Sequence, residues 1–137
     1  MPTLPTLARI AAELGVPIGR LFTPEDTSPY GRIRRIERRR FAEPDEHLVQ
    51  EQLTPTLGGQ MHAFAYSLEP GGATELTVHA GDEFAIVLAG EVEYEVAGER
   101  HRLAEGDCLY FNASQPHRVL NVGLGRADWL WVNAPPS

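Results

Sequence analysis

The chain has 137 residues, 42% of them hydrophobic, and a formal net charge of −7. This length suits a single domain that buries roughly two thirds of the surface of its unfolded chain. Its apolar runs are too short for a membrane-spanning helix. Its start lacks the pattern of a secretory signal peptide, and its one cysteine, Cys108, excludes an internal disulfide framework. We therefore expect a cytoplasmic protein with no membrane partner, in which Cys108 is a buried, small apolar residue.

The charges are distributed unevenly. All basic residues are arginines, and six of them lie in the stretch GRIRRIERRRF: Arg32, Arg34, Arg35, Arg38, Arg39 and Arg40. From residue 42 onward the chain carries fifteen Asp and Glu against four Arg, which argues against a nucleic-acid surface there. We interpret the arginine-rich stretch as the solvated face of an edge strand or as a subunit contact.

Residues 4–22 have the pattern of two short helices. Apolar residues recur mostly at spacings of three and four, Gly15 is typical of the residue after a helix, and Pro17 suits the first turn of the next one. Two short helices do not bury their own apolar faces. We expect the β-rich remainder of the chain, a second subunit or a further domain to cover Leu4, Leu7, Ile10, Leu14, Leu21 and Phe22.

Residues 23–31, TPEDTSPYG, have the composition of a linker, and a β pattern begins at residue 32. Short stretches separated by turn residues, without helices between them, predict an antiparallel sandwich or barrel. In the clearest strand, residues 91–96, Val92, Tyr94 and Val96 point inward and the three Glu point to water. Trp129 and Trp131 share one face of the last strand, and we interpret them as core or interface residues.

A polar cluster lies in the stretch ELTVHAGDEF. Period two places Glu75, Thr77 and His79 on one face of an extended segment, and Glu83 follows four residues after His79. On a straight strand, His79 and Glu83 would lie about 13 Å apart. Two ligands of one metal ion have donor atoms only about 3 Å apart. A shared site therefore requires a chain reversal at residues 80–82, where Gly81 is suited to the turn.

A second polar cluster begins at His117, after a turn. His79, Glu83 and His117 together would form a set of two histidines and one carboxylate. Such a set leaves coordination positions open and suits Fe(II), and also Mn, Co, Ni or Zn. The alternative is a polar pocket without an ion, in which Glu83 and His117 hydrogen-bond each other and Thr77. In both cases the predicted pocket residues are Glu75, Thr77, His79, Glu83 and His117.

Residues 71–121 resemble the two-part cupin signature. The matching landmarks are Gly71, Thr77, His79, Glu83 and Gly90 in the first part, and Gly106, Asn112, Ser114, His117 and Asn121 in the second. The family usually carries a His at the position of Thr77, and a Pro and a Gly at the positions of Asn112 and Ser114. The resemblance extends to about Val132. It implies an all-β cupin fold, a double-stranded β-helix or jelly-roll barrel, over residues 32–137.

The N-terminal stretch PTLPTLARIAAELGVPIGRLF resembles the last two helices of an XRE-type helix-turn-helix domain. That domain joined to a cupin is a common architecture of bacterial transcriptional regulators. The resemblance implies a remnant of the helix-turn-helix domain at residues 1–22, a linker at 23–31 and an effector-sensing cupin at 32–137. Met1 comes after the place of the recognition helix, so we expect DNA binding only where a complete helix-turn-helix is present.

The stretch GDEFAIVLAGEV is similar to part of the phosphonate-epoxidising, mononuclear non-haem iron enzymes, which share the helix-turn-helix plus cupin layout. Their iron ligands match the positions of His79, Glu83 and His117. Those enzymes also use a Lys, and this chain has none. We expect the chain to be a homodimeric domain that senses a small molecule, a function that does not require catalysis. The alternative is a metal-dependent enzyme that uses His79, Glu83 and His117. In either case the site could hold one divalent ion such as Fe, Mn, Ni or Zn.

Overall fold

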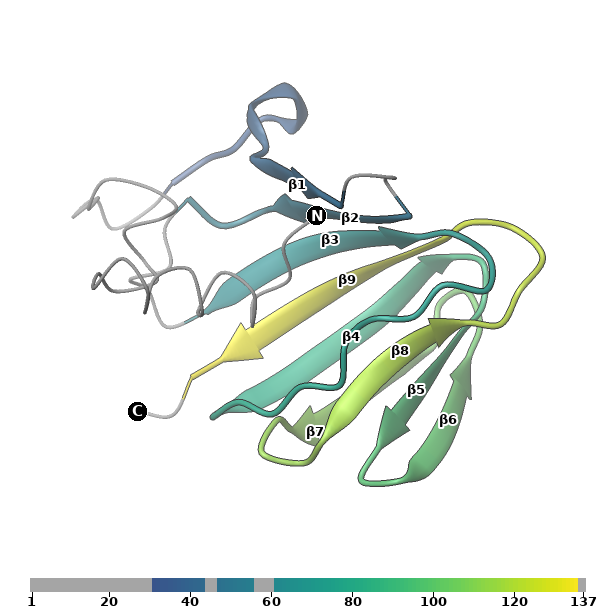
Figure 1. Cartoon of the computed structure of the whole chain (residues 1–137). Coiled ribbons are helices and arrows are strands. Elements are labelled where there is room, and N and C mark those ends of the chain that lie inside the picture. Colours follow the sequence, from purple (N-terminus) through teal and green to yellow (C-terminus); the bar gives the residue numbers. More distant parts are fainter. Residues whose placement is uncertain (1–30, 44–46, 56–60, 136–137) are drawn as a thin grey trace.

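The computed structural model describes residues 31–43, 47–55 and 61–135 (Figure 1). The two predicted helices of residues 4–22 and nearly all of the predicted linker lie outside the described residues. The described chain forms one short 3-10 helix, Arg35–Glu37, and the strands β1 (Arg40–Ala42), β2 (Leu48–Gln52), β3 (His62–Leu68), β4 (Asp82–Ala89), β5 (Val92–Val96), β6 (Glu99–Leu103), β7 (Cys108–Asn112), β8 (His117–Asn121) and β9 (Ala127–Ala134).

The strands form two sheets that face each other (Figure 1). The larger sheet has the order β1-β2-β3-β9-β4-β7, the smaller one has the order β6-β5-β8, and all neighbouring strands are antiparallel. This arrangement confirms the predicted all-β jelly-roll barrel. Within the described part of the chain, no helix is long and apolar enough to cross a membrane.

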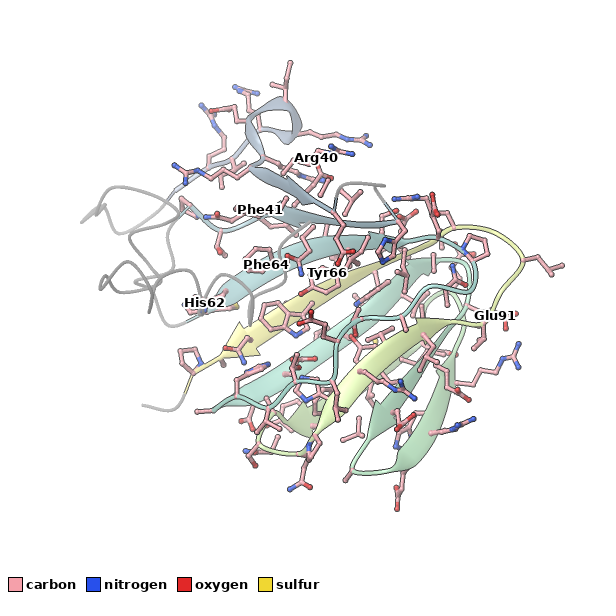
Figure 2. The ribbon with its side chains drawn as sticks, viewed as in Figure 1. Arg40, Phe41, His62, Phe64, Tyr66 and Glu91 are labelled. Atoms are coloured by element: carbon pink, nitrogen blue, oxygen red, sulfur yellow. The ribbon has the colours of Figure 1, made fainter. Side chains whose placement is uncertain are left out.

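The inner face of the larger sheet consists of rows of residues that lie opposite one another on adjacent strands. One row crosses β2, β3, β9 and β4 as Gln50, Tyr66, Trp129 and Val87. The next crosses the same strands as Gln52, Phe64, Trp131 and Ala85. Phe64 and Tyr66 stand along β3 in Figure 2. Most of these side chains are buried against the smaller sheet, so the space between the sheets contains both apolar and polar groups.

The predicted face of residues 91–96 is confirmed, because Val92 and Tyr94 are buried and Val96 packs against the core. The prediction for Cys108 is wrong. Alternation along β7 turns Phe111 inward, so Cys108 lies on the outer face and is exposed.

The arginine-rich stretch is only partly a strand. β1 begins at Arg40 and is the outermost of the described strands on its side of the larger sheet, while the solvated face and the subunit contact both stay predictions. Residues 32–39 are not β structure, and Arg35–Glu37 form the 3-10 helix instead. A hydrogen bond from the Glu37 backbone N–H to the Arg34 carbonyl, 2.8 Å long, closes this turn. Figure 2 shows Arg40 on β1, well away from the space between the two sheets.

Candidate metal centre

The segment between β3 and β4, residues 69–81, runs beside β8 and is called the strap below. The Thr77 N–H donates to the His117 carbonyl at 2.9 Å, and the His117 N–H donates back to the Thr77 carbonyl at 3.0 Å. A further bond joins the Thr74 N–H to the Val119 carbonyl at 2.9 Å. The strap therefore acts as an additional antiparallel strand, and it fixes Thr77 directly opposite His117.

The chain reverses at Gly81, immediately before β4. Gly81 has a φ of +101°, which side-chain-bearing residues rarely adopt. A Cβ at this position would also lie 2.3 Å from the Ala134 carbonyl oxygen. Both facts explain why the turn needs glycine. The reversal returns Glu83, the second residue of β4, to within 3.2 Å of His79, measured from Oε1 to Nε2.

His79, Glu83 and His117 converge between the sheets. One potential ligand atom from each residue lies within 4.8 Å of the other two. Glu83 Oε1 is 3.2 Å from His79 Nε2 and 3.4 Å from His117 Nε2. Two ligands that each lie about 2.1 Å from an ion are themselves about 3.0 to 3.4 Å apart at octahedral or tetrahedral angles. Each imidazole nitrogen is thus as far from the Glu83 carboxylate oxygen as a second ligand of one ion would be.

Hydrogen bonds orient both imidazole rings. His117 Nδ1 lies 2.7 Å from the Gln115 carbonyl oxygen and donates to it, so in the neutral ring Nε2 carries the lone pair. The Thr77 hydroxyl lies 3.1 Å from this Nε2 and is the donor. His79 Nδ1 lies 3.4 Å from both the Ala80 carbonyl oxygen and Asn133 Nδ2. Backbone carbonyls that accept from Nδ1, as those of Gln115 and Ala80 can, hold metal-binding histidines in position and leave Nε2 free for an ion.

The electrostatics of the cluster are those of a buried anion between two imidazoles. Burial alone would raise the pKa of Glu83, but the contacts with His117 and His79 outweigh it and lower the pKa below its usual 4.5. Burial likewise tends to lower the pKa of His117, and the Glu83 carboxylate outweighs this and raises it above 6.5. Glu83 is 2% exposed, and among the described residues its Oε1 has no hydrogen bond of good geometry. A buried carboxylate oxygen that lacks a hydrogen-bond donor is available to coordinate a cation.

A cavity of about 50 Å³ opens beside the cluster. This volume holds roughly three or four water molecules, or an ion with a small ligand. All five predicted pocket residues line it: Glu75, Thr77, His79, Glu83 and His117. The structure therefore brings the predicted residues together, while their role as metal ligands stays a prediction. Glu75 is exposed at the cavity and is not part of the three-residue cluster.

The cavity has further lining residues that the sequence patterns did not assign to it: Tyr66, Thr74, Tyr94, Val119 and Trp131. The alternation in β5 and β9 did predict that Tyr94 and Trp131 point inward, but it assigned them to the core. Trp131 contributes both to the core and to the cavity, since its ring centroid lies 5.9 Å from that of His79. It is also 6.2 Å from that of Tyr66, in a stacked arrangement. Strand periodicity identifies the inner face but not the part of it that borders a cavity.

A jelly-roll barrel with two histidines and a carboxylate in its interior is the architecture of a cupin. The model of the family described as "Cupin domain" matches residues 64–133, just over half of the chain, and the protein belongs to this family. The matched region runs from β3 to β9 and contains all three residues of the cluster.

Several proteins are similar to this chain. A solved cupin domain of an XRE family transcriptional regulator from Enterobacter cloacae is 24% identical, with a TM-score of 0.62, covering 66% of this chain and 99% of that one. Hydroxypropylphosphonic acid epoxidase from S. wedmorenis is 25% identical, with a TM-score of 0.67, covering 96% of this chain and 74% of that one. An uncharacterized protein of Archaeoglobus fulgidus is 36% identical over 52 residues, which cover 38% of this chain and about half (49%) of that protein.

Proposed function

We propose that His79, Glu83 and His117 bind one divalent metal ion, and that the cavity beside them binds a small molecule. The observation that carries the proposal is the buried Glu83 Oε1 placed 3.2 and 3.4 Å from two imidazole nitrogens. An ion held there would supply a Lewis acid with open coordination positions, because Thr77 replaces a potential fourth ligand. The chain's own residues would fix the ion, orient the ligand and limit access of water through the narrow cavity.

The biological role that we propose is effector sensing for a transcriptional regulator of the XRE family. The similarity to the cupin domain of such a regulator from Enterobacter cloacae supports this role. The acidic composition of the chain after residue 42 also fits a domain that senses a ligand and leaves DNA binding to another part of the protein. Sensing requires the ligand to bind two conformations with different affinity, and it does not require turnover.

A second candidate is a mononuclear metal enzyme. Two histidines and one carboxylate are the ligand set of non-haem Fe(II) oxygenases, and the cluster of His79, Glu83 and His117 has this composition. The similarity to hydroxypropylphosphonic acid epoxidase spans 96% of this chain, and an Fe(II) form of HppE gives the same coverage at a TM-score of 0.67. The chain has no Lys, so any substrate charge would have to be bound by other groups.

We also propose that the chain forms a homodimer. Among the described strands, β7 lies at one end of the larger sheet, and sheet edges are commonly covered by a partner. Light scattering at micromolar concentration tests this, and a monomer would contradict it.

The metal proposal is tested by loading the purified protein anaerobically with Fe(II), Mn(II), Ni(II) or Zn(II) and measuring bound ions per chain. We expect one ion per chain in the wild type, loss of binding in His117→Ala, and wild-type binding in His101→Ala, which changes a histidine of β6 that is in the same sheet as His117 but outside the cluster. Steady dioxygen uptake by the Fe(II) protein would favour the enzyme, and stoichiometric ion with no uptake would favour the sensor. The absence of stoichiometric binding for all four ions would refute the metal site.

A further inference from the structure

The wall of the cavity and the layer of side chains behind it contain polar groups that the metal cluster does not use. Gln50, Tyr94 and Trp129 are each about 99% buried, and the Gln50 amide, the Tyr94 hydroxyl and Trp129 Nε1 have no hydrogen-bond partner among the described residues. A buried polar group without a partner costs free energy, so native proteins retain few of them. Several such groups in one place therefore require an explanation.

Two tyrosines connect these groups to the cavity. Tyr66 and Tyr94 both line the cavity that His79, Glu83 and His117 line. Behind Tyr66, the strand register places Gln50 on one side and Trp129 on the other. The ring centroids of Tyr66 and Trp129 are 5.1 Å apart, in an edge-to-face arrangement. The four side chains thus form one polar group beside the metal cluster.

The electrostatics define which ligand group this region accepts. Burial, and then the negative charge of Glu83, raise the pKa of Tyr66 and of Tyr94 above the usual 10.0, so both remain neutral hydrogen-bond donors. The Gln50 amide beside Tyr66 and Trp129 Nε1 beside Tyr94 act to lower these pKa values, without forming hydrogen bonds of good geometry. None of the residues lining the cavity in the described chain is Arg or Lys, and two are Glu. In the metal-free protein an anionic group is therefore disfavoured in this part of the cavity.

We propose that Gln50, Tyr66, Tyr94 and Trp129 form a recognition subsite for the uncharged, hydrogen-bond-accepting end of a small ligand, such as an amide or another carbonyl group. The inference rests on the proposed function, because it names the class of molecule that the cavity binds. The cavity of about 50 Å³ limits this molecule to a few non-hydrogen atoms beyond the ion. The hydroxyl groups of Tyr66 and Tyr94 face the ligand, while Gln50 and Trp129 stand behind them as positioning residues.

The first test measures thermal unfolding of the metal-free protein. Tyr94→Phe removes a buried hydroxyl that has no partner and keeps the ring, so we expect the midpoint to rise by about 2 to 5 °C. Tyr110→Phe is the matched control, because Tyr110 is 66% exposed, and we expect its midpoint to be unchanged. A lower midpoint for Tyr94→Phe would show that the hydroxyl is satisfied in the free protein, and would overturn the proposal.

The second test uses three probes of equal size that share a hydroxymethyl group: glycolamide, glycolate and 2-methylpropan-1-ol. The chain has two tryptophans: Trp131 lines the cavity and Trp129 packs against Tyr66, so tryptophan fluorescence reports binding. We expect the metal-free protein to bind glycolamide at least about tenfold more tightly than either other probe. Gln50→Leu and Tyr94→Phe should remove this preference. Equal binding of the three probes, or no binding of glycolamide, would overturn the subsite.

The metal-free protein is used so that the proposed metal centre and the proposed polar subsite can be refuted independently of each other. Loss of stoichiometric metal binding would refute the metal centre and leave the probe preference measurable. A protein that binds one ion per chain but shows no preference for glycolamide would retain the metal centre and lose the subsite.

Discussion

Replacement of Gly81 by alanine tests how the turn between the strap and β4 holds His79 against Glu83. The φ of +101° would cost a residue with a side chain about 1 to 2 kcal/mol. The new Cβ would lie 2.3 Å from the Ala134 carbonyl oxygen and 2.9 Å from Pro135 Cα. Both neighbours are backbone atoms, so relief requires the chain to move, at about 1 to 3 kcal/mol as in other overpacked sites. The total expected loss of unfolding free energy is about 2 to 5 kcal/mol.

Gly98→Ala separates the two contributions. Gly98 has a φ of +82°, in the turn between β5 and β6, and a Cβ there meets nothing within 4 Å. We expect Gly98→Ala to lose about 1 to 2 kcal/mol from the backbone alone. Urea unfolding of the metal-free proteins measures both losses. Metal titration then distinguishes the variants further, because only Gly81→Ala displaces Glu83 relative to His79, and its affinity should fall at least about tenfold.

Equal unfolding free energies for Gly81→Ala and Gly98→Ala, together with unchanged metal affinity in both, would refute this reasoning. That result would mean that the contact between the turn and Ala134 relaxes without consequence, and that the strap alone positions His79.

Three further predictions concern the carboxylate, pH and the thiol. Glu83→Gln should weaken metal binding by more than about 100-fold, since it removes the one anionic ligand. The control Glu93→Gln, on β5, should bind metal as the wild type does in the same titration. Equal metal affinities of the two variants would contradict the role of Glu83 as a ligand. His117 has a raised pKa, so its contribution to the stability of the metal-free protein is fully present below pH 6.5 and is lost as the pH rises through the folded-state pKa. Metal affinity should increase over the same window, because binding displaces the proton, and affinity independent of pH between about pH 6 and 8 would argue against His117 as a ligand. Cys108 is exposed, so one thiol per native chain should react with a thiol reagent in the folded protein, and protection until unfolding would contradict the structure.

The sequence was most informative where function depends on local geometry. Period-two alternation gave the inward side of β5 and β9, and the four-residue spacing of His79 and Glu83 required the reversal that Gly81 provides. Both inferences depend on residues close together in the chain. The pairing of Thr77 with His117, forty positions apart, followed from the resemblance to cupins and not from local pattern.

The sequence was least informative where burial depends on strand pairing. Gln50 and Gln52 are polar residues, and nothing near them in the chain indicates that they are among the most buried side chains. Their position follows from the register of β2 against β3, which is a long-range property. Cys108 was misassigned for a related reason, because its neighbours are apolar on both faces of β7 and only the pairing of that strand with β4 determines which face is inside.

The central claim is that the two histidines and Glu83 bind one ion. Anomalous diffraction from crystals loaded with Co(II) tests it most directly. We expect a single strong peak about 2.0 to 2.3 Å from His79 Nε2, His117 Nε2 and Glu83 Oε1. A map with no peak at these three atoms, from crystals in which Co(II) is present at full loading, would contradict it.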